Sequence, residues 1–231
     1  MTRVFRSTLL ALLLLPSAAA AQVSLGVRAA YALPSGDAYE QPGFGTFKEK
    51  DLAKAAVPFQ LDATWRFTPA FSGGVYLAYG VGQAGSKLST MCSTAGASCD
   101  RPTVIRYGVE GAYGFGPAGP VEPWLGLAAG VESASFKVKH FTYGVIPGTP
   151  PAPLVADLSG TLRGWDARLE GGADYRLGSA FVAGPYLSVG IGQYRVQHVT
   201  LSDQGTVAGG GVDSARSHGW WSLGLRGRFD L

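Results

Sequence analysis

Residues 219–231 read Gly219-Trp-Trp-Ser-Leu-Gly-Leu-Arg-Gly-Arg-Phe-Asp-Leu231. From Trp221 onward, every second residue is apolar or Gly, and the residues between are Ser, Gly, Arg, Arg and Asp. A period of two indicates a β-strand with one apolar and one polar face, not a helix. An ordinary edge strand of a soluble protein seldom exposes so much aromatic and leucine surface. The pattern is typical of a strand with lipid on one face and a lumen on the other.

Seven earlier segments carry the same alternation or are compatible with it: 23–33, 57–67, 73–83, 103–115, 123–136, 161–176 and 181–195. Each is about as long as the ~9–11 residues that a tilted strand needs to cross a bilayer. The connections alternate between long (34–56, 84–102, 137–160, 196–217) and short (68–72, 116–122, 177–180). Long external loops and short periplasmic turns are typical of an outer-membrane barrel.

The predicted fold is therefore all-β: a transmembrane, antiparallel, up-and-down β-barrel of eight strands. An unpaired backbone group costs several kcal/mol in hydrocarbon, so the first and last strands are expected to pair and close the barrel. Pro185 falls inside a predicted strand and cannot donate a ladder hydrogen bond, which predicts a bulge at that position.

The first residues predict export. Arg3 and Arg6 precede an apolar run at 9–15, and Pro16 and the small residues 17–21 follow. This layout is that of a cleaved signal peptide over residues 1–21. The run is shorter than the roughly 20 residues of a transmembrane helix. We expect a single barrel domain over residues 22–231, located in the bacterial outer membrane and surrounded by its lipid.

Composition agrees with a barrel wall. Charged residues make up 15% of the chain and Gly numbers 34, against about 25% charged residues in typical soluble domains and about half as much Gly. Removing residues 1–21 takes two of the 19 basic residues, which leaves 17 basic and 16 acidic residues and a charge of +1. Without a cluster of Lys or Arg, nucleic-acid binding is not expected.

The polar faces of the segments collect nearly all their ionisable groups, seven acidic and seven basic: Arg28, Asp62, Arg66, Arg106, Glu110, Glu132, Asp166, Arg168, Glu170, Asp174, Arg176, Arg226, Arg228 and Asp230. A charge facing the middle of a bilayer costs about 2–4 kcal/mol for Arg or Lys, so we expect these groups to face inward. An eight-stranded barrel is just wide enough for side chains to fill it. The hypothesis is a nearly neutral ion-pair network that blocks the lumen.

Aromatic residues are expected to mark the two membrane interfaces. Near the short turns or the C-terminus they are Trp65, Phe67, Phe71, Tyr113, Phe115, Trp124, Tyr175, Phe181 and Phe229. Toward the long loops they are Tyr31, Phe59, Tyr79, Trp165, Tyr194, Trp220 and Trp221, of which a few are expected to point inward.

Cys92 and Cys99 lie in a polar stretch of a chain that is expected to be exported. A disulfide is the favoured interpretation for such a pair. A metal site would need more ligands than this pair supplies, and no His lies nearby. We predict neither a metal nor a cofactor.

With these features the chain resembles the small eight-stranded outer-membrane β-barrels of the OmpA-like, OmpX-like and OmpW-like porin-type families. The resemblance rests on the architecture and on Trp221, Leu223, Leu225, Phe229 and Leu231 of the terminal strand. It implies that the barrel-assembly machinery reads this strand. Family members usually end in an aromatic residue, whereas this chain ends in Leu231.

Enzymatic activity is not expected, because catalysis would need a nucleophile beside a base that a carboxylate holds. His140, His198 and His218 fall in long loops or at external strand ends, and a lipid-modifying enzyme is the least favoured function. The favoured function is a structural or surface-interaction protein whose long loops meet an extracellular ligand. The alternative is a narrow channel or a transporter of small or apolar molecules, with room beside inward glycines such as Gly126, Gly130, Gly190 and Gly192. Easing the curvature of a tight barrel is the favoured role of these glycines.

Overall fold

The computed structural model describes residues 22–41, 45–93, 96–116, 120–143, 154–202, 205–212 and 214–231. The predicted signal peptide at 1–21 lies outside these residues and stays a prediction. Within them, no helix is both long enough and apolar enough to span a membrane.

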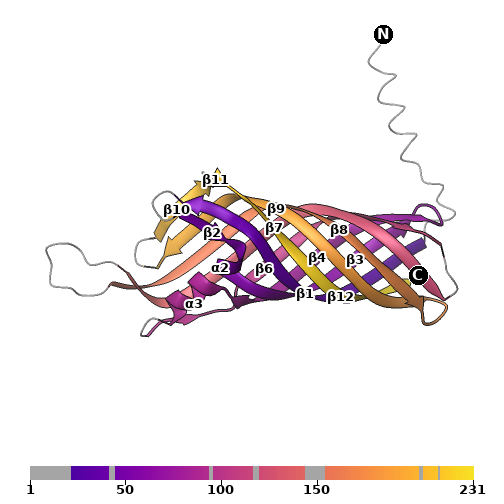
Figure 1. Ribbon diagram of the computed structural model, residues 1–231, viewed down its shortest axis with the longest axis horizontal. Helices are drawn as coiled ribbons and strands as arrows, with labels where there is room; N and C mark the ends of the chain where they lie inside the picture. Colours follow the sequence, from indigo (N-terminus) through magenta and orange to yellow (C-terminus); the bar gives the residue numbers. More distant parts are fainter. Residues whose placement is uncertain are drawn as a thin grey trace, which may run out of the picture.

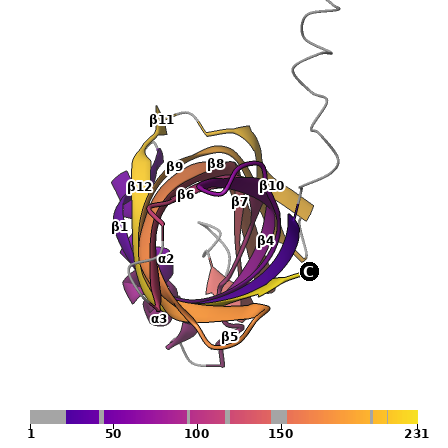
Figure 2. The same ribbon diagram turned by 90° about the vertical axis from the view of Figure 1, so that its right-hand side faces the viewer.

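Eight strands form a closed ring (Figures 1 and 2): β1 (Gln22–Gln41), β3 (Ala53–Arg66), β4 (Phe71–Ala84), β6 (Thr103–Gly114), β7 (Val121–Tyr143), β8 (Leu154–Arg176), β9 (Phe181–Leu201) and β12 (Ser217–Asp230). Each pairs antiparallel with the next. β12 also pairs with β1, where Ser24 lies opposite Asp230 and Leu33 opposite Trp221, which closes the barrel. The predicted fold is confirmed.

The two ends of the barrel differ. The turn end carries the connections from β3 to β4, from β6 to β7 and from β8 to β9, together with the C-terminus. The loop end carries the short elements β2 (Gly45–Lys48), α2 (Glu49–Leu52), α3 (Ser86–Cys92), β5 (Ser98–Cys99), β10 (Gly205–Gly211) and β11 (Ser214–Ala215). The long connections therefore all lie at one end.

Much of what the sequence suggested as loop at 137–160 and 196–217 is strand. β7 continues to Tyr143, β8 already begins at Leu154, and β9 reaches Leu201. Outside the apolar band the strands are held by backbone pairing and can expose polar side chains to water. Lys137 and Lys139 are therefore compatible with a strand there. These strands raise the loop end above the apolar band.

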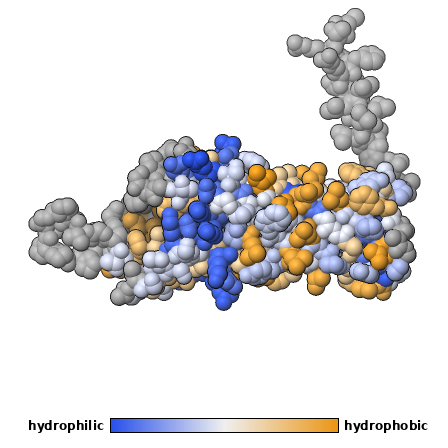
Figure 3. Space-filling model, viewed as in Figure 1, coloured by the Kyte–Doolittle hydropathy of each residue, from blue (hydrophilic) through white to orange (hydrophobic). Residues whose placement is uncertain are grey.

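The alternation separates the two faces as predicted. On β12, Leu223 and Leu225 are 64% and 67% exposed on the outer surface, whereas Arg226 and Asp230 are buried. Apolar residues gather on the half of the outer surface nearer the turn end, and hydrophilic residues toward the loop end (Figure 3). The outer wall is therefore suited to hydrocarbon, and the inner face is polar.

Three of the aromatic residues expected at the interfaces point into the barrel, of which only Trp124 departs from the expectation, since a few of the loop-side residues were expected to point inward. Trp124, Tyr194 and Trp220 are buried on the inner face. Their even numbers place them on the inner face of β7, β9 and β12, as the strand period requires. The prediction for Trp124 was wrong because its place in the strand period turns it inward although it lies near a turn. The other eight residues expected near the turns or the C-terminus are exposed or half-buried.

The predicted bulge at Pro185 is also wrong. Pro185 lies in register opposite Leu225 of β12, and the pairing of β8 with β9 keeps its register on both sides of it. The register shift between these strands lies instead at Arg195, because Val196 faces Arg163 and Tyr194 faces Gly164. Proline removes only one donor from a ladder, and its backbone stays extended.

Candidate functional site

The most connected polar group inside the barrel is the guanidinium of Arg28 on β1. Its Nε donates to Asp62 Oδ2 at 2.7 Å, and its Nη2 donates to the two Glu110 oxygens at 2.7 and 2.8 Å. Its Nη1 donates to Glu170. In the ring of eight, β1 lies opposite β7, and β6 and β8, which carry Glu110 and Glu170, flank β7. Arg28 therefore spans the lumen.

A second link crosses the lumen from β8 to β3. Arg168 Nη1 donates to Gln60 Oε1 at 3.0 Å, and Gln60 Nε2 donates to Asp62 Oδ1 at 2.6 Å. Arg168 also forms ion pairs at 3.3 Å with Asp166 and with Glu170. Arg28 and Arg168, with Gln60, Asp62, Glu110, Asp166 and Glu170, form the central cluster. Its two arginines lie among four carboxylates. Acidic groups therefore outnumber basic groups in the middle of the barrel.

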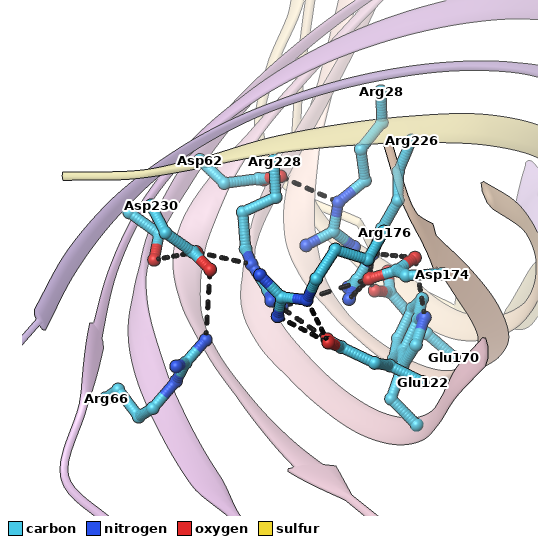
Figure 4. A network of polar contacts seen from close by, with 12 residues as sticks. Arg28, Asp62, Arg66, Glu122, Glu170, Asp174, Arg176, Arg226, Arg228 and Asp230 are labelled. Carbon is cyan, nitrogen blue, oxygen red and sulfur yellow. Dashed lines mark hydrogen bonds and ion pairs between the residues drawn. The ribbon is translucent and has the colours of Figure 1, made fainter. Parts of the chain in front are cut away.

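A turn-end cluster comprises Arg66, Glu122, Asp174, Arg176, Arg226, Arg228 and Asp230, and Figure 4 shows it beside Arg28, Asp62 and Glu170 of the central cluster. Arg226 Nε lies 3.0 and 3.1 Å from the two oxygens of Asp174, and its guanidinium lies 3.6 Å above the ring of Trp124. Arg228 and Arg66 contact Asp230 at 2.9 and 3.3 Å. A cavity of about 370 Å³ lies among these side chains at the turn end.

The loop-end cluster comprises Glu49, Arg106, Glu132, Tyr194 and His218. Glu132, fully buried, accepts a hydrogen bond from Arg106 Nε at 2.7 Å and one from Tyr194 Oη at 2.7 Å. His218 Nε2 lies 3.3 Å from the same carboxylate. Glu49 comes from α2, so this cluster connects a short element of the loop end to four strands of the barrel.

Pairing is what makes these buried charges tolerable. An ionised group deprived of water costs several kcal/mol unless partners compensate it. Charge-assisted and bidentate contacts of Arg with carboxylates are the strongest available compensation. The largest penalty therefore falls on any change that removes one partner and leaves the other buried.

The fourteen residues of the predicted network distribute over these three clusters, and Arg176 differs from the rest. Its side chain is 41% exposed at the rim of the turn end, where it pairs with Glu122. Sequence reasoning missed Glu122 and Gln60, although both lie on the inner face by parity. It also missed Glu49, for which no periodic signal exists in a long connection.

His218 lies at the loop end of β12, but it is buried beside Glu132, not at an exposed strand end. This is a base next to a carboxylate, as catalysis would require. Among the residues that the structure describes, the other ring nitrogen, Nδ1, has no hydrogen-bond partner. The inner glycines mainly make room for large neighbours: a Cβ on Gly130 would lie 2.6 Å from Tyr76 Oη, and one on Gly192 would lie 3.0 Å from His218 Nε2.

The loop end also contains an apolar chamber. Its volume is about 220 Å³, and its walls include Tyr39, Phe47, Leu52, Leu88, Phe136 and Val199. The disulfide between Cys92 and Cys99 joins α3 to β5, and β5 pairs with β7. In the part of the chain that the structure describes, no three or more His, Cys, Asp or Glu side chains are grouped to hold a metal ion.

The closed ring, the outward apolar band and the polar inner face together define a transmembrane β-barrel of eight strands. No protein-family model matches the chain, and no curated protein matches it either. Among solved structures, a major outer membrane protein from Thermus thermophilus is similar with a TM-score of 0.57 at 12% identity, over 92% of this chain and 100% of that one. Neisserial surface protein A is similar with a TM-score of 0.50 at 14% identity, over 90% and 97%. The chain thus has the fold of the small outer-membrane barrels.

Proposed function

We propose that this chain is an integral protein of the bacterial outer membrane whose lumen is closed by ion pairs and whose loop end contacts partners outside the cell. The observation that carries closure is the position of Arg28, which joins β1 to Glu110 and Glu170 near the opposite wall. An ion crossing the barrel would have to displace this guanidinium from its three carboxylates. The cost of separating buried, paired charges opposes that displacement.

The outer surface supports the proposed location. Leu223, Leu225 and Phe229 of the terminal strand are at least half exposed and face outward, where lipid would cover them. We propose that the barrel-assembly machinery reads this strand, as its sequence resemblance implies, and that residues 1–21 direct export. With lipid around the band, the turn end faces the periplasm and the loop end faces outward.

The raised loop end supports a role in surface interaction. β7, β8 and β9 continue past the apolar band, and the disulfide restrains α3 beside β7. Rigid scaffolds that present irregular segments commonly bind partners through them. Deleting residues 86–99 should abolish binding of whole cells to their surface ligand without loss of the folded barrel.

The apolar chamber favours a second function, the binding of small apolar molecules at the loop end. Pockets of this kind are lined mainly by apolar side chains with few polar groups. Filling the chamber by Leu88→Trp separates the two functions, because it would prevent uptake of a small apolar probe and leave surface binding intact. We do not propose an enzymatic role, because no hydroxyl or thiol group of the described residues is hydrogen-bonded to His218 Nδ1.

Liposome swelling tests closure. Wild-type protein should admit no small sugars or ions, and the triple variant R28A/E110A/E170A, which empties the middle of the lumen, should admit them. Arg163→Ala is the matched control, because Arg163 is exposed and contacts Tyr107 outside the lumen. Swelling with wild-type protein at the rate of the triple variant would contradict closure.

A further inference from the structure

Glu49 is the first residue of α2, yet its side chain is only 1% exposed. One of its oxygens, Oε1, lies 3.1 Å from Tyr194 Oη, and the other, Oε2, has no hydrogen-bond partner among the described residues. A buried oxygen without a partner is tolerable on a neutral carboxyl group and very costly on an ionised one. The surroundings therefore favour a neutral Glu49.

The single proton of the Tyr194 hydroxyl group also favours a neutral Glu49. Its hydroxyl group lies within hydrogen-bond distance of both Glu49 and Glu132, but a phenol carries one proton and can donate only once. Glu132 is the closer acceptor at 2.7 Å, and Arg106 compensates its charge at 2.7 Å. The contact at 3.1 Å is then a hydrogen bond only if a protonated Glu49 donates to the phenol oxygen.

Other charged groups near α2 leave this assignment unchanged. The groups that face Glu49 are Arg106 on β6, Glu132 on β7, Tyr194 on β9 and His218 on β12. On the elements packed directly on α2, Lys87 of α3 lies 3.8 Å from Asp51, and the backbone N–H of Lys48 also donates to Asp51. On β1, Asp37 lies opposite Lys48 in the strand register and Tyr39 stacks on Phe47, while Lys54 of β3 is exposed.

We propose that the protonated carboxyl group of Glu49 is a pH-sensitive latch that holds α2 in the loop end of the barrel. When Glu49 loses its proton, a second negative charge appears beside Glu132, and the hydrogen bond to Tyr194 loses its donor. The new carboxylate regains hydration only by leaving the cluster, and the short helix leaves with it.

Burial raises the pKa of Glu49 from 4.5 to about 7, with Glu132 adding to the rise and His218 opposing it. Because the pKa is higher in the docked state than in water, docking is most favourable below about pH 4.5. It weakens as pH rises and becomes constant again above about pH 7. Between these limits the docking equilibrium falls about tenfold per pH unit.

Hydrogen–deuterium exchange of α2 in the full-length chain, in nanodiscs from pH 4 to 9, tests the latch. Glu49→Gln keeps the shape of the protonated group and cannot ionise, so α2 should stay docked in it at every pH. The ratio of wild-type to E49Q protection cancels the intrinsic pH dependence of exchange. We expect a ratio near one at pH 4.5 that falls to the order of 10⁻² at pH 7 and then levels off. A ratio that stays near one at all pH values would overturn the proposal.

A second variant covers the case in which E49Q does not fold, which heat-modifiable gel migration would reveal. Tyr194→Phe removes the hydroxyl group and keeps the ring. Its α2 should exchange faster than that of the wild type at pH 5, and equally fast at pH 9, where the wild-type latch is already open. Equal exchange at both pH values, or a difference only at pH 9, would contradict the latch.

Discussion

Arg28 and Glu170 form an ion pair across the lumen although 142 residues separate them in the chain. The same guanidinium holds Asp62 beside it and Glu110 near the far wall. One side chain thus ties β1 to β6 and β8, two strands that do not pair with β1 in the sheet. The lumen of an eight-stranded barrel is narrow enough for side chains from opposite walls to contact each other directly.

Removing Arg28 should destabilise the barrel strongly. Arg28→Ala leaves three carboxylates buried without their common partner, and breaking a buried pair in this way typically costs about 3–5 kcal/mol. Urea unfolding in lipid, followed by heat-modifiable migration, measures the loss. Arg163→Ala, on the exposed face, should change stability by less than about 0.5 kcal/mol. Equal midpoints for the two variants would mean that Arg28 carries no structural role.

The contact of the outer apolar surface with hydrocarbon can be tested on the terminal strand. Leu225 is 67% exposed and lies midway along β12, so Leu225→Arg should cost about 2–4 kcal/mol if hydrocarbon surrounds it. Leu177 is equally exposed at 67%, but it lies in a short connection at the turn end. Leu177→Arg should cost about 0–1 kcal/mol, as near an interface. A comparable loss in both variants, measured by unfolding in lipid, would argue against the assigned membrane position.

Gly130 should tolerate no larger residue. A Cβ there would lie 2.2 Å from the carbonyl oxygen of Tyr107 and 2.6 Å from Tyr76 Oη, and backbone atoms cannot give way cheaply. Gly130→Ala should therefore destabilise by about 1–3 kcal/mol. At Gly178 no atom of the described residues lies within 4 Å of the added Cβ, so Gly178→Ala serves as the control. If both variants unfold at the same urea concentration, the inner face is less tightly packed than described.

Asp51 should give α2 a pH dependence opposite to that of Glu49. Burial alone would raise the pKa of Asp51, but the Ser86 hydroxyl, the Lys48 backbone N–H and Lys87 hold it below its usual 3.8. Because the folded-state pKa is lowered, the stabilisation is present above pH 3.8 and is lost as pH falls through the lower value. Protection of α2 in wild type should approach that of Asp51→Asn only in strong acid. Protection in wild type that is already no higher than that of Asp51→Asn above pH 3.8 would contradict this assignment.

The strand period predicted much of this molecule, and its failures have physical causes. Parity alone placed Arg28 and Asp174 inside, because a charge in hydrocarbon is costly. Parity could not predict that Arg28 pairs with Glu110 and Glu170, since the ion-pair partners across a lumen depend on barrel shear and on side-chain length. The buried position of Glu49 could not be predicted, because no periodic signal describes how a long connection folds back into the barrel.

Single-channel recording of the wild-type protein in planar bilayers measures whether the cross-lumen ion pairs close the barrel. With Arg28 bound to Asp62, Glu110 and Glu170, we predict no stable conductance steps at moderate voltage. Stable, reproducible steps from wild-type protein of verified folded migration would contradict a closed lumen.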